Sequence, residues 1–142
     1  VNIIIKPNSN DNKCSSTNLI LKRNSSKNLD LIIYVFSKAK NFAYRKKMRQ
    51  TWANLTQYSN RNFKIVFILS INKTLSNQNR NDNYDDNLYK KLLDENKIYN
   101  DLICGDGFSD TNNKRYRPLK LLIAWKWISA YCRNVDYVLK LD

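Results

Sequence analysis

The stretch Asp30-Leu31-Ile32-Ile33-Tyr34-Val35-Phe36-Ser37 decides the fold of this chain. Its apolar core is a near-continuous β-branched and aromatic run of strand length, which is typical of a strand buried on both faces of a parallel sheet. Ser37 ends the run, and a helix is expected to begin near Phe42, with Asn41 as its N-cap. A strand followed directly by a helix is the unit from which parallel sheets are built.

The same alternation of strand and helix continues along the chain. Further strands are expected at 63–71, within 98–104, where Gly105 and Gly107 end the strand, and at 137–141, with helices at 87–99 and 119–132. This order predicts an α/β fold, with a mostly parallel sheet covered by helices on both faces. Because ligands of such sheets bind beyond the carboxyl ends of the strands, a functional site is expected there.

The composition excludes several kinds of site. The 142 residues include no His, which rules out a Ser-His-Asp triad and an HExxH zinc site, and only 2 Gly, which rules out glycine-rich phosphate loops. The 25 Lys and Arg residues against 12 Asp and Glu give a net charge of +13, so an anionic partner is expected. The apolar runs are far shorter than the ~20 residues of a membrane helix.

Two parts of the chain differ in character. Residues 1–28 are rich in Asn, Ser and Lys and are expected to form a loose, stem-like lead-in, whereas the regular pattern occupies 29–142. The chain begins with Val1 rather than Met and ends at Asp142 directly after a strand, and we interpret it as a fragment. Three Asn-x-Ser/Thr sequences, at Asn24, Asn54 and Asn72, permit N-glycosylation.

Charged side chains near the expected strand ends are the candidate ligand contacts. Arg45 and Arg49 lie one helical turn apart, and two guanidinium forks at this spacing suit a pyrophosphate; a solvated basic helix face is the alternative. Asp106, Asp110 and Asp142 follow strands and could offer hard oxygen ligands to a divalent cation. For Asp106 and Asp110, capping of their loops is the alternative.

The tryptophans are expected to pack in the core. Trp52, Trp125 and Trp127 could stack on nucleic-acid bases, but all three lie in or beside expected helices. No signature of an RNA-recognition motif or a helix-turn-helix is legible.

Several motifs together resemble those of the β-1,3-galactosyltransferase-like glycosyltransferases (glycosyltransferase family 31). Arg45-x-x-Met48-Arg49-x-Thr51-Trp52 resembles the R-x-x-I-R-x-T-W signature of that family. Glu95-x-x-x-Tyr99-x-Asp101-Leu102, then Asp106 to Thr111, and finally Tyr137 to Asp142 resemble its later motifs in the same order. Gly107 interrupts the family's D-F pair, and the loop 112–117 is longer than usual.

The resemblance implies the nucleotide-sugar-binding half of a GT-A type, Rossmann-like domain. Such enzymes are inverting hexosyltransferases, of the β-1,3-galactosyl- or N-acetylglucosaminyltransferase type. They move a sugar from a UDP-sugar to a glycan or glycoprotein acceptor, usually with Mn2+. The resemblance also implies the lumenal side of the Golgi membrane and a type II anchor outside this segment. Since the catalytic base is expected beyond residue 142, the segment alone is expected to be inactive.

The resemblance assigns roles to individual residues. Those expected near the nucleotide are Ser37, Asn41, Arg45 and Arg49. Asp110 and Lys120 are expected to line the donor side, and Asp142 is expected at the metal. Cys132 is expected to form a disulfide, with a partner beyond Asp142 or with Cys104. The family implies no nucleic-acid partner. Two alternatives stay open, namely a basic module that binds nucleic acid or an acidic glycan and a fragment that does not fold alone.

Overall fold

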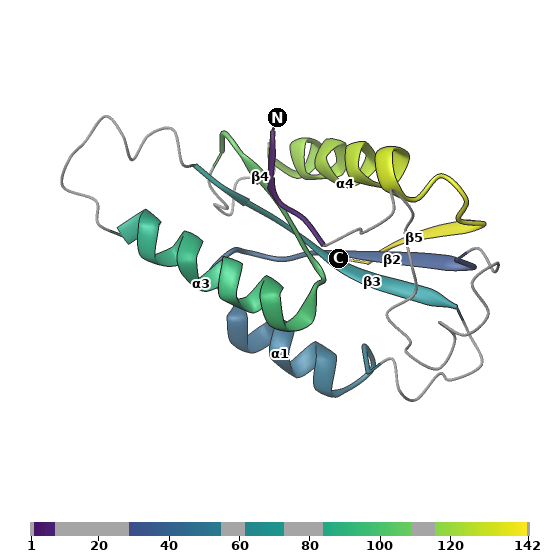
Figure 1. Cartoon of the computed structure of the whole chain (residues 1–142), viewed down its shortest axis with the longest axis horizontal. Helices are drawn as coiled ribbons and strands as arrows, with labels where there is room; N and C mark the ends of the chain where they lie inside the picture. Colours follow the sequence, from purple (N-terminus) through teal and green to yellow (C-terminus); the bar gives the residue numbers. More distant parts are fainter. Residues whose placement is uncertain (1, 8–28, 55–61, 73–83, 109–115, 142) are drawn as a thin grey trace.

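The computed structural model describes residues 2–7, 29–54, 62–72, 84–108 and 116–141. In this part of the chain five strands form one sheet in the order β1-β4-β3-β2-β5, with helices on both faces (Figure 1). The strands are β1 (Ile3–Ile5), β2 (Leu31–Phe36), β3 (Phe63–Ile71), β4 (Leu102–Asp106) and β5 (Tyr137–Leu141). The helices are α1 (Phe42–Gln50), α3 (Tyr84–Tyr99) and α4 (Arg117–Tyr131). The predicted α/β class is confirmed.

The sheet is parallel from β4 to β5. β3 pairs with β2 on one side and with β4 on the other, and β5 adds to the outer side of β2, all in parallel. The four strands therefore end on one side of the molecule, on the left in Figure 1, and we call this side the carboxyl edge. Gly105 lies within β4, so the prediction that it ends the third strand is wrong. Gly107 does follow the strand, with a φ of 107° that few other residues adopt.

The beginning of the chain also differs from its prediction. Ile3–Ile5 was assigned to the loose lead-in, but it forms β1, which pairs antiparallel with β4. Ile5 is buried, because this short apolar run covers what would otherwise be the exposed edge of β4. Residues 8–28 lie outside the described residues.

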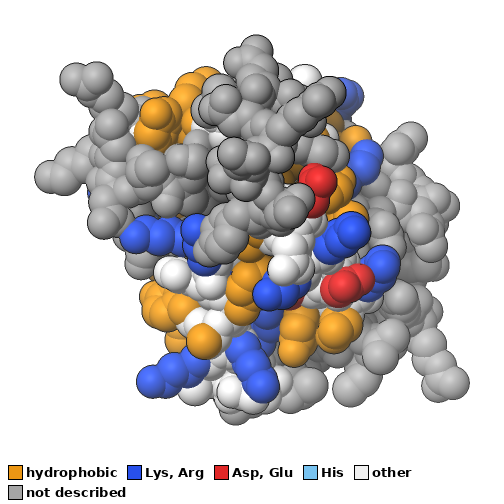
Figure 2. All heavy atoms as spheres, turned by 90° about the vertical axis from the view of Figure 1, so that its left-hand side faces the viewer, with side chains coloured by type: hydrophobic (Ala, Val, Ile, Leu, Met, Phe, Trp, Pro, Cys, Tyr) orange, Lys and Arg blue, Asp and Glu red, His pale blue; other side chains and the backbone are white. Residues whose placement is uncertain are grey.

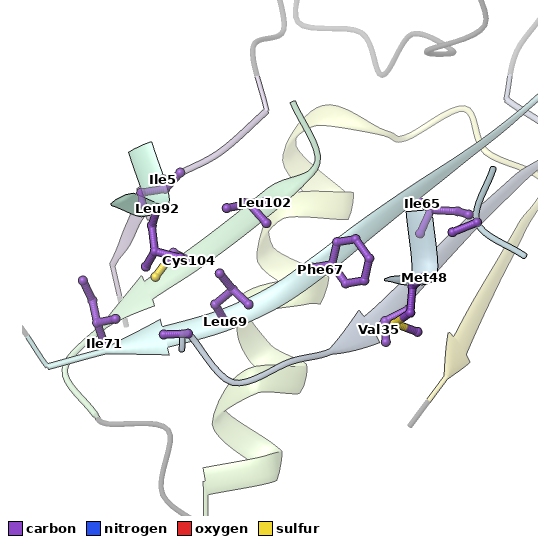
Figure 3. Close-up of a cluster of buried hydrophobic side chains, with 12 residues drawn as sticks. Ile5, Val35, Met48, Ile65, Phe67, Leu69, Ile71, Leu92, Leu102 and Cys104 are labelled. Atoms are coloured by element: carbon purple, nitrogen blue, oxygen red, sulfur yellow. The ribbon is translucent and has the colours of Figure 1, made fainter. Parts of the chain in front are cut away.

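Alternate side chains of β3 enter two separate cores. On one face, Phe67 and Leu69 pack with Met48 of α1 and Leu92 of α3 (Figure 3). On the other face, Val66 and Ile68 pack against α4. Burying one such side chain contributes roughly 1.5–3 kcal/mol, so both faces of β3 stabilise the sheet.

The three tryptophans do not share one environment. Trp127 is 1% exposed and packs against the sheet as predicted, but Trp52 and Trp125 expose 37% and 64% of their surfaces. The core prediction is therefore wrong for these two. α4 also carries apolar residues on the face away from the sheet, among them Leu122 and Trp125. No helix in the described ranges is long and apolar enough to span a bilayer.

One charged residue lies inside the second core. Lys64 of β3 is 4% exposed, and its Nζ lies 5.9 Å from the centre of the Trp127 ring. Burial lowers the pKa of Lys64 from 10.5 to about 8, although the negative charge of Asp101 opposes the shift. The unfolded chain therefore binds more protons than the native state between these two values, and stability rises with pH across that range.

We predict that Lys64→Met stabilises the protein at pH 7 by on the order of 3 kcal/mol, because the variant buries no ammonium group. The gain should shrink as the pH rises from 8 to above 10.5, where the native lysine is neutral in both states. Urea denaturation at pH 7 and pH 10.5 measures this, with the exposed Lys90→Met as the control. An equal gain at both pH values would contradict the burial argument.

Candidate functional site

The chain leaves β2 at the carboxyl edge through residues 37–41, which we call the β2 loop. Ser37 and Ala39 are buried, whereas Lys38, Lys40 and Asn41 are exposed. The backbone N–H of Ser37 donates to a carbonyl of β3 at 3.1 Å, so the loop begins as a continuation of the sheet. The loop thus presents two lysines and an asparagine at the edge where ligands of parallel sheets bind.

The β2 loop rests on a fully buried arginine. Arg45 of α1 donates from Nε and Nη2 to the two carboxylate oxygens of Glu95, at 2.9 and 2.6 Å. Its Nη1 donates to Ser37 Oγ at 3.1 Å and to the Lys38 carbonyl at 2.7 Å, and Nη2 also donates to the Ala39 carbonyl at 3.1 Å. A guanidinium group has five N–H donors, so Arg45 has none left for a ligand.

A second buried cation reaches the β2 loop from the opposite face of the sheet. Lys120 of α4 donates from Nζ to the Ser37 carbonyl at 2.8 Å. Ser37 is therefore held from both faces, by Arg45 at its hydroxyl and by Lys120 at its carbonyl. The structure thus brings together three of the residues that the resemblance placed near the donor.

Arg49 continues the ionic contacts away from the loop. Its Nε and Nη2 donate to both oxygens of Asp101, at 2.7 and 2.8 Å, and its Nη1 donates to Glu95 at 2.8 Å. Its guanidinium carbon also lies 3.9 Å from the centre of the Tyr99 ring. We call Arg45, Arg49, Glu95 and Asp101 the charge network.

Burial and pairing act against each other in the charge network. Burial disfavours the cation of Arg49, but the hydrogen bonds and charges of Asp101 and Glu95 outweigh it and raise the pKa of Arg49. Burial raises the pKa of the Asp101 carboxyl group, and the hydrogen bond and charge of Arg49 limit that rise. The guanidinium group of Arg49 therefore stays charged although it is partly buried.

These contacts differ from both sequence-based interpretations of the two arginines. Arg45 and Arg49 neither present paired forks to a pyrophosphate nor form a solvated face, because Glu95 and Asp101 neutralise them inside the protein. These partners lie 46 to 52 residues away in the sequence. The Glu95 to Asp101 motif was visible in the sequence, but its pairing depends on how α3 packs beside α1.

The β2 loop also carries two residues that the sequence analysis missed. Lys38 and Lys40 project at the carboxyl edge, and their signal was the alternation of small and basic residues in Ser37-Lys38-Ala39-Lys40. Figure 2 views this edge and shows Lys and Arg side chains spread over it, with apolar and acidic side chains between them. Such a surface suits an anionic ligand.

The remaining predicted residues are placed only in part. Asn41 is exposed and occupies the N-cap position of α1 as predicted, although its side chain makes no capping hydrogen bond. Asp110 and Asp142 lie outside the described residues. Leu141, the last residue of β5, pairs with Val35, so the strand that leads to Asp142 lies beside β2.

The described residues do not by themselves fit a metal ion. None of them form a group of three His, Cys, Asp or Glu side chains that could ligate one. The Oδ1 atom of Asp106 accepts the N–H of Gly107 at 2.8 Å, which confirms the loop-capping alternative for Asp106. A metal site here would need carboxylates from outside the described ranges, such as Asp142.

The structure excludes one of the two partners that were expected for Cys132. Cys104 is buried and forms no disulfide bond, whereas Cys132 is disulfide-bonded. The pairing of Cys132 with Cys104 is therefore wrong, and the partner of Cys132 lies outside the described residues.

Comparison with known proteins adds a family and several relatives. The family described as Galactosyltransferase matches residues 43–142. Lactosylceramide 1,3-N-acetyl-beta-D-glucosaminyltransferase of Xenopus tropicalis is 33% identical over 132 residues, which cover 87% of this chain and 32% of the relative. UDP-GalNAc:beta-1,3-N-acetylgalactosaminyltransferase 1 of Mus musculus is 29% identical, with 83% and 32% covered. Beta-1,3-galactosyltransferase 1 of Mus musculus is 25% identical, with 79% and 30% covered. The chain spans about a third of the length of these curated relatives.

We predict that Glu95→Leu lowers the free energy of unfolding by about 3–5 kcal/mol, because Arg45 then stays buried without a counter-charge. The double variant Arg45→Met with Glu95→Leu should recover much of this loss, since no unpaired charge remains. Chemical denaturation measures both. Asp94→Leu on the same helix is the control, because Asp94 and its partner Lys97 are exposed. A double variant less stable than Glu95→Leu alone would contradict this account.

Proposed function

The chain belongs to the galactosyltransferase family, and on this basis we propose that the protein is a hexosyltransferase that moves a sugar from a nucleotide-sugar donor to an acceptor hydroxyl. The observation that carries the proposal is the β2 loop. Two buried cations hold its backbone, and two exposed lysines stand at the carboxyl edge. This is the edge at which α/β sheets bind nucleotides.

The relatives indicate which part of the donor this segment recognises. Their names share a 1,3 linkage but differ in the sugar, which is N-acetylglucosamine, N-acetylgalactosamine or galactose. Each nevertheless matches most of this chain. We therefore assign the segment to the part that such donors have in common, the uridine diphosphate, rather than to the sugar.

In this proposal, different residues at the carboxyl edge act on different parts of the donor. Ser37 and Asn41 lie at the nucleotide, and Lys120 acts on this site through the Ser37 carbonyl. Asp110 belongs to the donor side. Asp142, which follows β5 in the sequence, supplies a hard oxygen ligand to a divalent cation, for which Mn2+ is the expected ion. When bound, such a cation neutralises the diphosphate leaving group.

The proposed reaction is an inverting β-1,3 transfer. The acceptor oxygen attacks the anomeric carbon, the bond from that carbon to the diphosphate breaks, and a base removes the hydroxyl proton. The acceptor is a glycan or glycoprotein. We place the base beyond residue 142, so the segment by itself is inactive.

The sulfur chemistry supports a location in the secretory pathway. The disulfide bond of Cys132 is typical of an oxidising compartment. The Asn-x-Ser/Thr sequences are compatible with that environment. We therefore propose the lumenal side of the Golgi membrane, with the anchor outside this segment.

The nucleic-acid alternative rests on the net charge of +13. That charge counts three buried cations, Arg45, Lys64 and Lys120, and two buried anions, Glu95 and Asp101, so burial changes the balance by only one charge. A nucleic-acid complex should weaken steeply with salt and be indifferent to Mn2+, which separates it from a donor complex.

We predict that the protein in its full native length binds UDP only with Mn2+ present, and that Asp142→Asn weakens this binding at least about tenfold through loss of a charged ligand. Isothermal titration calorimetry with and without Mn2+ measures both effects. Asp136→Asn is the matched control, because Asp136 is an exposed aspartate at the other end of β5. Equal UDP affinity in the two variants would remove Asp142 from the site, and UDP binding without Mn2+ would refute the metal.

A further inference from the structure

The three successive backbone carbonyls that follow β2 are all bound by buried cations. The Ser37 carbonyl accepts from Lys120, and the carbonyls of Lys38 and Ala39 accept from Arg45. Hydrogen bonds from a charged donor are roughly twice as strong as neutral ones. Side chains from α1 and α4 therefore set the path of the loop together with the loop's own hydrogen bond from the Asn41 N–H to the Lys38 carbonyl at 3.0 Å.

Arg45 can hold the loop only because Glu95 holds Arg45. A buried guanidinium group needs both a counter-charge and partners for all its donors. Glu95 supplies the charge through a two-point contact at 2.9 and 2.6 Å, which also fixes the plane of the guanidinium group. With that plane fixed, the remaining donors point at the hydroxyl and carbonyl groups of the loop.

Fixing the loop backbone also fixes where its lysines stand. Ala39 is 3% exposed and Ser37 is 4% exposed, so Lys38 and Lys40 are the members of the alternation that face outward. A lysine is a point charge on a flexible stem, and its position depends on the backbone that carries it. A pre-ordered backbone reduces the cost of ordering that side chain around an anion.

We propose that Arg45 and Glu95 are positioning residues that set the β2 loop so that Lys38 and Lys40 contact the diphosphate of the donor. This inference rests on the proposed function, because it takes the carboxyl edge to be the donor site. Arg45 acts through the loop and touches no part of the donor. Lys38 and Lys40 are the contacts, and the pair of Arg45 and Glu95 beneath them gives those contacts their geometry.

A mutant cycle on UDP affinity tests the coupling, with the protein in its full native length and Mn2+ present. Glu95→Gln should weaken UDP binding about tenfold, and so should Lys38→Gln with Lys40→Gln. The triple variant should bind no more weakly than the double-lysine variant, because Glu95 acts through those lysines. Additive losses would show that Glu95 affects binding by another route and would overturn the proposal.

Asp101→Asn is the matched control, since it is the same acid-to-amide change in the same charge network. Asp101 pairs with Arg49, and the hydrogen bonds of Arg49 among the described residues go to Asp101 and Glu95 rather than to the β2 loop, so UDP affinity should not change. An equal loss of affinity in Asp101→Asn would reduce the role of Glu95 to general stability. Should Glu95→Gln fail to fold in thermal unfolding, Arg45→Lys replaces it, because lysine keeps the charge but loses the fork.

The outcomes for this inference and for the proposed function are distinguishable. If the unsubstituted protein binds no UDP, the proposed donor site is refuted, and this inference with it. If it binds UDP and the cycle is additive, the donor site stands and only the positioning role is overturned.

Discussion

The guanidinium group of Arg45 has no exposure to solvent, and much of the molecule is arranged to satisfy it. A buried cation without a counter-charge is costly, and one without hydrogen-bond partners is costlier still. Arg45 meets both needs by joining Glu95 of α3 to the backbone that follows β2. One residue therefore links the two helices beneath the sheet to the edge at which a ligand would bind.

The sheet could be predicted because burial on both faces leaves a plain trace in sequence. Phe63–Ile71 is the central strand and is buried at nearly every position, so its apolar run is continuous and its bounds were predictable. Ile3–Ile5 carries no such information, since a run of that length has no periodicity. The prediction that Gly105 ends the third strand failed for a different reason. It lies in β4 opposite a bulge in β1, and glycine inside a strand often marks such an irregularity.

The site was less predictable than the fold, because its decisive contacts are between distant segments. The four-residue spacing of Arg45 and Arg49 shows that they share a helix face, but not whether that face meets water, a ligand or another helix. The ion pairs with Glu95 and Asp101 determine what this face meets, and these pairs form only because α3 packs beside α1. Lys120 was predicted as a donor-side residue through the family resemblance alone. Its hydrogen bond to Ser37 follows from α4 crossing the opposite face of the sheet.

The exposure of apolar residues on α4 and β5 also could not be predicted from the sequence. Ile123 and Trp127 face the sheet, whereas Leu122 and Trp125 expose 59% and 64% of their surfaces. Tyr137 on the outermost strand β5 exposes 72%. An apolar sequence predicts how much surface an element would bury, but it does not identify the layer that covers it. In a chain that spans about a third of its relatives, the sheet covers one side of α4 and one edge of β5. Predictions for side chains on their other sides, Trp125 among them, therefore could not be made from the pattern alone.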